Sequence, residues 1–472
     1  MDRLHTFGAA TAIALLLAGC GGHSSSKKGS TTAPVNTAPV NTNNPPPGTA
    51  ITVSAPAGGP TAARIGPDAV ALALDLAVSG GGAAQLTGLT LTAAGTLDES
   101  SGLGALKVVG DDNKNGLVDA GERVMASVAA PAFSADDGTI AVTFTQSITI
   151  ASGASLRLIV AVDASATGAA AVAKVGKTVE LRVAAAGDVT ATSNGQAITP
   201  AGTFPVSSGP VTLFLHDHLL ISEVVPQPTA AEYIEIFNPT GETIDLTNYY
   251  LTDYTLTATP PHTYQQLPAG GAALAPTSTD WLVRFPAGAT IAPGQVKVIA
   301  MDGAAFPTAF PGKTPDFSIR GATAQAPQML TLNTTTGVWS AVAPAVGVGL
   351  TNTGEPVILF FWDGQSDLVQ DVDYVYYGGT SPTNANVEKT GASVDGPDAD
   401  TTPTPYLPDT PGFQQSVRGS PVPTLTSNGA QRIEFTEGAE TSTGGNGITG
   451  HDETSEDWSQ TFIIGAATPG VP

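Results

Sequence analysis

"LLISEVVPQPTAAEYIEIFNPTGETIDLTNYYLTDY", residues 219–254, decides the fold of the C-terminal half of the chain. Ile221 and Val224 precede a proline-containing turn, and residues 233–237 then follow the period-two pattern of a strand. The Asn-Pro and Thr-Gly pairs at 238–241 mark the next turn. This order predicts strand, turn, strand, turn, strand.

The same stretch closely resembles the lamin tail domain family through "ISEV", "EYIEIFN" and "DLTNYYLTD". Other pieces extend the resemblance over residues 218–472, namely "FPAGATIAPGQVKVIA" (285–300), "GLTNTGEPVILFFWDGQSDLVQDVDY" (349–374), Trp458 and the closing Thr-Pro-Gly at 468–470. The resemblance implies an immunoglobulin-like sandwich. Three segments exceed the length that such a sandwich needs, near 255–280, 303–348 and 379–450. Loops that long are usually functional or disordered.

The preceding region, residues 51–205, also has the period-two pattern of β-structure. Apolar residues alternate with small or polar ones in five runs, at 70–78, 89–92, 140–145, 156–162 and 179–183. Strands that are apolar on one face and joined by Gly-, Ser- and Asp-rich turns predict an antiparallel sandwich. Only the alanine-rich segment 164–175 suggests a helical turn. We therefore expect an all-β protein with two immunoglobulin-like β-sandwich domains in tandem, 51–205 and 218–472, separated by a connector at 206–217.

The N-terminus has the pattern of an export signal. Arg3 precedes an apolar run at 7–17 that is too short to span a membrane, and "LAGC" follows at 17–20. This tetrad resembles the bacterial lipobox, which implies a signal peptide at 1–19 and a lipid on Cys20, the only cysteine. Residues 20–50 are rich in Pro, Ser and Thr and predict a disordered tether. We expect an exported protein that is lipid-anchored to the bacterial cell envelope, at the outer membrane or cell surface, with the membrane as a partner.

The composition restricts the classes of partner. Charged residues make up only 12% of the chain, and 41 acidic residues outnumber 18 basic ones, for a net charge of −23. Such a surface repels phosphate backbones, so nucleic-acid binding through a basic face is disfavoured. It favours divalent cations, although most of the acidic residues need no role beyond solubility.

The segment "DDNKNGLVDAGE", residues 111–122, fits the calcium loop pattern of an EF-hand without a mismatch. Its flanks read as strands, so we expect the loop to join two strands and to bind Ca²⁺ in a structural role; a solvated Asp/Asn/Gly turn is the alternative. Extracellular calcium sites of this kind have Kd values of about 10⁻⁴–10⁻³ M. The predicted ligands are Asp111, Asn113, Asn115, the Leu117 carbonyl, Asp119 and Glu122.

Weaker candidates lie in the second domain. The acidic segments 395–400 and 451–458 predict solvated loops, with a second metal site as the alternative. Asp371 and Asp373 share a strand and are expected to face solvent rather than to act in acid/base chemistry. We interpret His216-Asp217-His218 as a linker in preference to a metal site, and Gly445–Gly450 as a glycine-rich loop. Six aromatic residues could form a sugar-binding platform, namely Trp281, Trp339, Trp362, Tyr374, Tyr376 and Tyr377. The spacing of the three tyrosines is equally that of a core strand.

These features favour a non-catalytic surface lipoprotein that acts in adhesion, scaffolding or ligand binding, with an extracellular protein or glycan as ligand. The alternative is a metal-dependent extracellular hydrolase, or an accessory to one, that uses the acidic loops at 395–457. Four or more carboxylates converging beside a cleft would favour the enzyme. Dispersed carboxylates with an exposed aromatic patch would favour binding.

Overall fold

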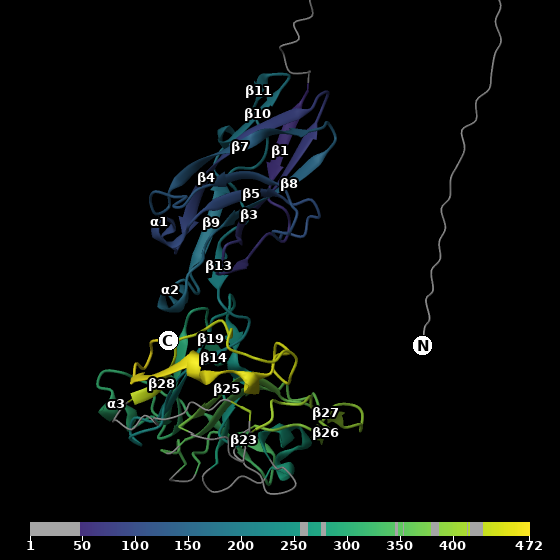
Figure 1. Ribbon diagram of the computed structural model, residues 1–472. Helices are drawn as coiled ribbons and strands as arrows, with labels where there is room; N and C mark the ends of the chain where they lie inside the picture. Colours follow the sequence, from purple (N-terminus) through teal and green to yellow (C-terminus); the bar gives the residue numbers. More distant parts are fainter. Residues whose placement is uncertain are drawn as a thin grey trace, which may run out of the picture. The chain divides into compact units, whose positions relative to one another are not determined.

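The computed structural model describes the chain from residue 48 onward, with short gaps (Figure 1). Within these residues the chain is almost entirely strand and turn, which confirms the all-β prediction. No helix of the described part is long and apolar enough to cross a membrane. The predicted signal peptide at 1–19, the predicted lipidation site Cys20 and the predicted tether up to residue 47 lie outside the described residues. The described ranges are 48–254, 263–274, 280–344, 348–352, 354–378, 387–412, 414–415 and 428–472.

The first domain is a sandwich of two antiparallel-rich sheets that share one apolar core. Inward-facing leucines of the period-two runs, such as Leu74 and Leu91, are fully buried in that core. The first sheet has the order β1 (Ala50–Ser54), β3 (Ala69–Ser79), β8 (Ser155–Val162), β5 (Leu106–Gly110) and β6 (Val124–Val128). The second has the order β11 (Gln196–Ile198), β10 (Val189–Ser193), β4 (Ala84–Gly95), β9 (Thr178–Val183), β13 (Val211–Phe214) and β2 (Ala62–Arg64), with β7 (Thr139–Ile150) on β4 and β12 (Val206–Ser207) on β9. The helical turns are α1 (Glu99–Gly102), α2 (Gly168–Val172) and η1 (Ala186–Asp188).

All five predicted strand runs of the first domain lie on strands, and α2 lies in the alanine-rich segment where a helical turn was expected. The predicted connector, 206–217, contains two more strands of this sandwich. β12 and β13 both pair with β9, so the sheet continues to Phe214. Strands of two and four residues are too short for a period-two alternation to be recognised in the sequence.

The second domain is built from two six-stranded sheets around a core that is rich in aromatic residues. One sheet has the order β21 (Phe317–Arg320), β20 (Val296–Asp302), β15 (Tyr233–Phe237), β14 (Leu220–Val225), β28 (Asn428–Arg432) and β29 (Phe462–Ala466). The other has the order β23 (Val338–Ser340), β22 (Leu330–Asn333), β18 (Leu282–Arg284), β17 (Tyr249–Thr252), β24 (Glu355–Phe361) and β25 (Gln370–Tyr377). Two small pairs add β16 (Ile244–Asp245) with β19 (Thr290–Ile291), and β26 (Ser393–Val394) with β27 (Thr404–Pro405). The helical turns are α3 (Phe306–Ala309), α4 (Trp458–Thr461), η2 (Leu246–Asn248), η3 (Tyr264–Ala269), η4 (Gly271–Ala273) and η5 (Glu453–Ser455).

Most of the candidate platform aromatics are core residues. Trp281 and the three tyrosines of β25 are buried, whereas Trp339 and Trp362 are only half-buried. The core-strand interpretation is therefore confirmed for the three tyrosines.

Two buried glutamates tie the opening strands of this domain to its C-terminal turn. Glu235 accepts a hydrogen bond from the Gly470 amide (2.6 Å), and Glu223 accepts one from the Thr468 amide (3.1 Å). Burial raises the pKa of Glu235 to about 7. The strand glutamates and the closing Thr-Pro-Gly are thus one hydrogen-bonded unit, although more than 230 residues separate them in sequence.

Candidate functional site

The predicted calcium loop joins β5 to β6, two antiparallel neighbours, as its flanks indicated. Asp111 is buried, and its two carboxylate oxygens accept the amide N–H groups of Asn115 and Gly116, each at 3.1 Å. Gly116 has φ +80°, the left-handed conformation that a glycine adopts without strain. The loop is therefore wound around the Asp111 carboxylate.

The other predicted ligands gather in the same turn. The side-chain amides of Asn113 and Asn115 both reach Asp119 Oδ2, each at 2.7 Å. Glu122 accepts the Asp119 amide N–H through Oε2 (2.9 Å), while its Oε1 is buried without a hydrogen-bond partner among the described residues. An oxygen-rich loop with a spare buried carboxylate oxygen fits a hard cation such as Ca²⁺. The structure leaves the cation itself untested.

A surface hollow of about 480 Å³ lies at the end of β24 and β25. Trp362 lines it, and the indole is oriented by a hydrogen bond from Nε1 to the Ser366 carbonyl (2.8 Å). Asp363, Asp367 and Asp398 lie around the same hollow. A hydrogen bond from the Thr404 hydroxyl lowers the pKa of Asp367, so this carboxylate is ionised at neutral pH. Two aromatic side chains, Phe361 and Trp362, beside several acceptors are the lining expected for a polar ligand with apolar C–H faces.

The acidic and glycine-rich segments contribute to this hollow. Gly445, Asn446 and Gly447 line it from the Gly445–Gly450 segment, which remains a loop as expected. Of the acidic segment 395–400, Asp398 and Asp400 are exposed, in agreement with a solvated loop. Carboxylate oxygens of Asp367, Asp395 and Asp398 lie within 4.8 Å of one another.

The prediction that Asp371 and Asp373 face solvent is wrong. Both are buried on β25, and each pairs with a buried cation. Asp371 lies 2.5 Å from the Lys389 ammonium, which also contacts Asp409 at 3.2 Å. Burial raises the pKa of the Asp371 carboxyl. Sequence reasoning missed Lys389 because its partners lie 18 and 20 residues away, beyond any local pattern, although a lone cation in an acidic region was a signal.

Asp373 belongs to a second buried cluster, centred on Arg432. The guanidinium donates to Asp373 (2.6 Å), Glu437 (3.1 Å) and Glu456 (3.2 Å), and every one of these side chains is at least 97% buried. Burial raises the pKa of Glu456 to about 7. Three carboxylates thus share one guanidinium, so the buried cluster has excess negative charge when the acids are ionised.

The prediction of a solvated acidic loop at 451–458 is wrong for most of its members. Asp452, Glu453 and Glu456 are buried, and His451 pairs with Glu440 at 2.6 Å. Residues 428–432 form β28 beside β14, and the following loop covers these acids. Tertiary packing therefore buries most of the segment 451–458, although its acidic composition is typical of a surface loop.

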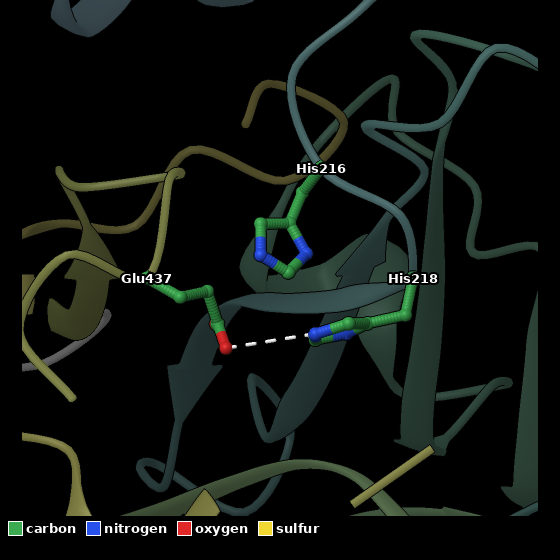
Figure 2. A group of neighbouring side chains, drawn as sticks. All are labelled: His216, His218 and Glu437. Carbon is green, nitrogen blue, oxygen red and sulfur yellow. Dashed lines mark ion pairs between the residues drawn. The ribbon is translucent and has the colours of Figure 1, made fainter. Parts of the chain in front are cut away.

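His216-Asp217-His218 lies in the connection between β13 and β14, as interpreted, but its two histidines are not solvated linker residues. They are buried, with exposed fractions of 6% and 2%, and their rings lie edge to face with centroids 4.3 Å apart. Figure 2 shows both imidazoles and the Glu437 carboxylate converging on one small space, with His218 Nε2 3.6 Å from Glu437 Oε2. Burial lowers the pKa of His216 to about 2 and also lowers the pKa of His218, so both rings are neutral. Glu437 was not a candidate from sequence, where it is one acid among many.

Comparison with known proteins supports the resemblance for part of the chain. The family model described as Lamin Tail Domain matches residues 216–378. The matched region begins at His216 and includes β14, β15, β24 and β25. It leaves the acidic loops after residue 378 outside the match.

Solved structures add similarity at low identity. One is a DUF4876 family protein from Bacteroides thetaiotaomicron, with 14% identity, coverage of 80% of this chain and 93% of that chain, and a TM-score of 0.28. Another is the major pilin subunit of Bacillus cereus, with 10% identity, coverage of 52% and 58%, and a TM-score of 0.14. At these TM-scores neither structure bears on fold or function. No curated protein matches the chain significantly.

Proposed function

We propose that this protein is an exported, lipid-anchored binding protein that holds an extracellular glycan in the hollow beside Trp362 and does not transform it. The observation that supports this most is the lining of that hollow, one oriented indole face next to ionisable oxygen acceptors. A volume of about 480 Å³ lies within the range of small-ligand pockets, about 300–1,000 Å³. Each carboxylate oxygen can accept more than one hydrogen bond, so these acids retain capacity for sugar hydroxyls.

The distribution of carboxylates also favours binding over hydrolysis. Those that converge most closely, around Arg432, are buried and bonded within the protein. The group of Asp367, Asp395 and Asp398 beside the hollow is the observation that favours the alternative, a metal-dependent hydrolase or hydrolase accessory. A cation at this group would serve ligand binding in the first case and water activation in the second.

We further propose that the loop at 111–122 binds Ca²⁺ in a structural role. The winding of the loop around Asp111 and the unpartnered Glu122 Oε1 support this assignment. Bound there, the ion would neutralise the loop carboxylates and link the ends of β5 and β6. In a chain whose single cysteine is assigned to the lipid anchor, such a link stabilises the first sandwich in place of a disulfide.

A glycan array with the full chain carrying Cys20→Ser tests the binding proposal. We expect selective binding that falls about tenfold or more in Trp362→Ala, because burying an aromatic side chain contributes ~1.5–3 kcal/mol and tenfold is ~1.4 kcal/mol. Trp339→Ala is the matched control, since Trp339 packs on Tyr250 and does not line the hollow. A folded chain that binds no glycan refutes the proposal. Cleavage of a bound glycan in the presence of Ca²⁺ or Mg²⁺ supports the hydrolase instead.

A further inference from the structure

A second metal site, unrelated to the calcium loop, is indicated by three buried atoms that have no hydrogen-bond partner in the described chain. They are His216 Nδ1, His218 Nε2 and Glu437 Oε2. One ligand atom from each of the three residues lies within 4.8 Å of the others. Leaving a buried polar atom unpaired is destabilising, because its lost hydration is not replaced by a hydrogen bond. Unpaired buried atoms on three residues whose ligand atoms converge therefore point to a missing partner common to these residues (Figure 2).

The tautomer of His218 shows what kind of partner this is. Its Nδ1 lies 2.9 Å from the Leu219 carbonyl oxygen, which can only accept, so Nδ1 carries the proton. In the neutral ring Nε2 is then a lone pair, and it faces Glu437 Oε2, a second acceptor, at 3.6 Å. A protonated carboxyl cannot bridge them, because 3.6 Å is too long for a hydrogen bond. A metal-bound histidine typically donates its other ring N–H to a carbonyl in this way.

The spacing and the charge both fit a small divalent ion. Two ligands at about 2.1 Å from a tetrahedral ion are about 3.4 Å apart, close to the 3.6 Å between His218 and Glu437. The Arg432 cluster next to this site has more carboxylates than cations, so a divalent ion offsets buried negative charge. Glu453 belongs to a neighbouring group with Glu437 and Asp373, and its Oε1 is also buried without a partner.

We infer that His216, His218 and Glu437 bind a divalent transition-metal ion, best fitted by zinc. Imidazole nitrogen with carboxylate oxygen is a zinc ligand set, whereas Ca²⁺ and Mg²⁺ take oxygen ligands. The ligands are at least 94% buried, which is typical of a closed structural site rather than of a catalytic centre. The ion joins the segment before β14 to the loop after β28 and so holds the start of the second sandwich against its last strands.

The test is metal binding by the full chain with Cys20→Ser, first stripped with a chelator and then equilibrated with zinc alone. We expect one zinc per chain by elemental mass spectrometry after desalting, and a higher melting temperature for the tryptophan fluorescence transition. His216→Gln/His218→Gln should bind zinc more than about 100-fold more weakly, above the loss expected for outer-shell residues. His451→Gln is the matched control and should keep its zinc, because His451 has its own partner, Glu440.

A readout on the wild-type chain keeps the test decisive if the double variant does not fold. With ¹⁵N-histidine labelling, zinc should shift the ring nitrogen signals of two of the six histidines. A folded wild-type chain that retains no zinc and shows no such shift overturns the inference. Zinc binding of equal strength in the wild type and in a folded double variant overturns it as well.

Discussion

Replacing Arg432 by methionine should strongly destabilise the second sandwich. Methionine preserves much of the side-chain volume and removes the guanidinium that bonds Asp373, Glu437 and Glu456, at 2.6–3.2 Å. It also removes the bond from Nε to the Ile221 carbonyl (2.9 Å). Removing one partner of a buried ion pair costs about 3–5 kcal/mol, because the remaining charge is left uncompensated. With three carboxylates on one guanidinium, we expect the upper half of that range.

The loss should depend on pH. Burial already raises the pKa values of Glu437 and Glu456 in the folded state, and without the guanidinium they rise further above those in the unfolded state. The stability of the variant is then retained below the unfolded pKa, about 4, and falls as pH rises through the folded values. The difference from wild type should therefore be smaller at pH 5 than at pH 8.

Urea unfolding followed by tryptophan fluorescence measures this difference in the second sandwich, since all four tryptophans lie in its sequence. A chelator in the buffer keeps metal ions from replacing the lost charge. Arg284→Met is the control, because Arg284 bonds the Thr247 carbonyl and the Asn248 side chain rather than a carboxylate. It should cost about 1 kcal/mol at either pH. A loss below ~1 kcal/mol in Arg432→Met, or one equal at pH 5 and pH 8, refutes the reasoning.

Three further outcomes are expected. Lys389→Met should cost about 3–5 kcal/mol in urea unfolding because Asp371 and Asp409 lose their shared cation, and adding Asp371→Asn should recover part of it. Burial raises the pKa of Glu232 from 4.5 to about 7, so this carboxyl stabilises the fold below pH 4.5 and the contribution is lost as pH rises through 7. Glu232→Gln should remove that slope, worth up to ~3 kcal/mol, from unfolding curves at pH 5–8; an unchanged slope contradicts the assignment. Glu122→Gln should abolish the calcium-dependent rise in the melting temperature of the first sandwich without affecting zinc content, and a rise equal to wild type counts against the calcium loop.

Local pattern was sufficient for much of the fold. The alternation in runs such as 70–78 and 156–162 identified β3 and β8, because a half-buried strand imposes a period of two on its own residues. The position of the loop at 111–122 between two strands was predicted as well, since the loop and its flanking strands are consecutive in sequence, while calcium binding by the loop stays a prediction. Short strands were not predicted, as with β12 and β13, because two and four residues are too few to show a period of two.

The site residues show the same difference between what local sequence predicts and what only tertiary packing decides. Sequence by itself determined the all-β class, the lamin tail resemblance and the loop at 111–122, all of which depend on residues close to one another in the chain. Only the tertiary structure decided that Glu437 faces His218, that Arg432 serves three carboxylates, and that acids of the segment 451–458 are buried. The physical reason is that burial and charge pairing depend on tertiary neighbours outside any local pattern. Asp373 is 59 residues from Arg432, and β14 lies more than 200 residues before β28. An acidic residue has the same identity in a solvated loop and in a buried metal site, and only its surroundings distinguish the two.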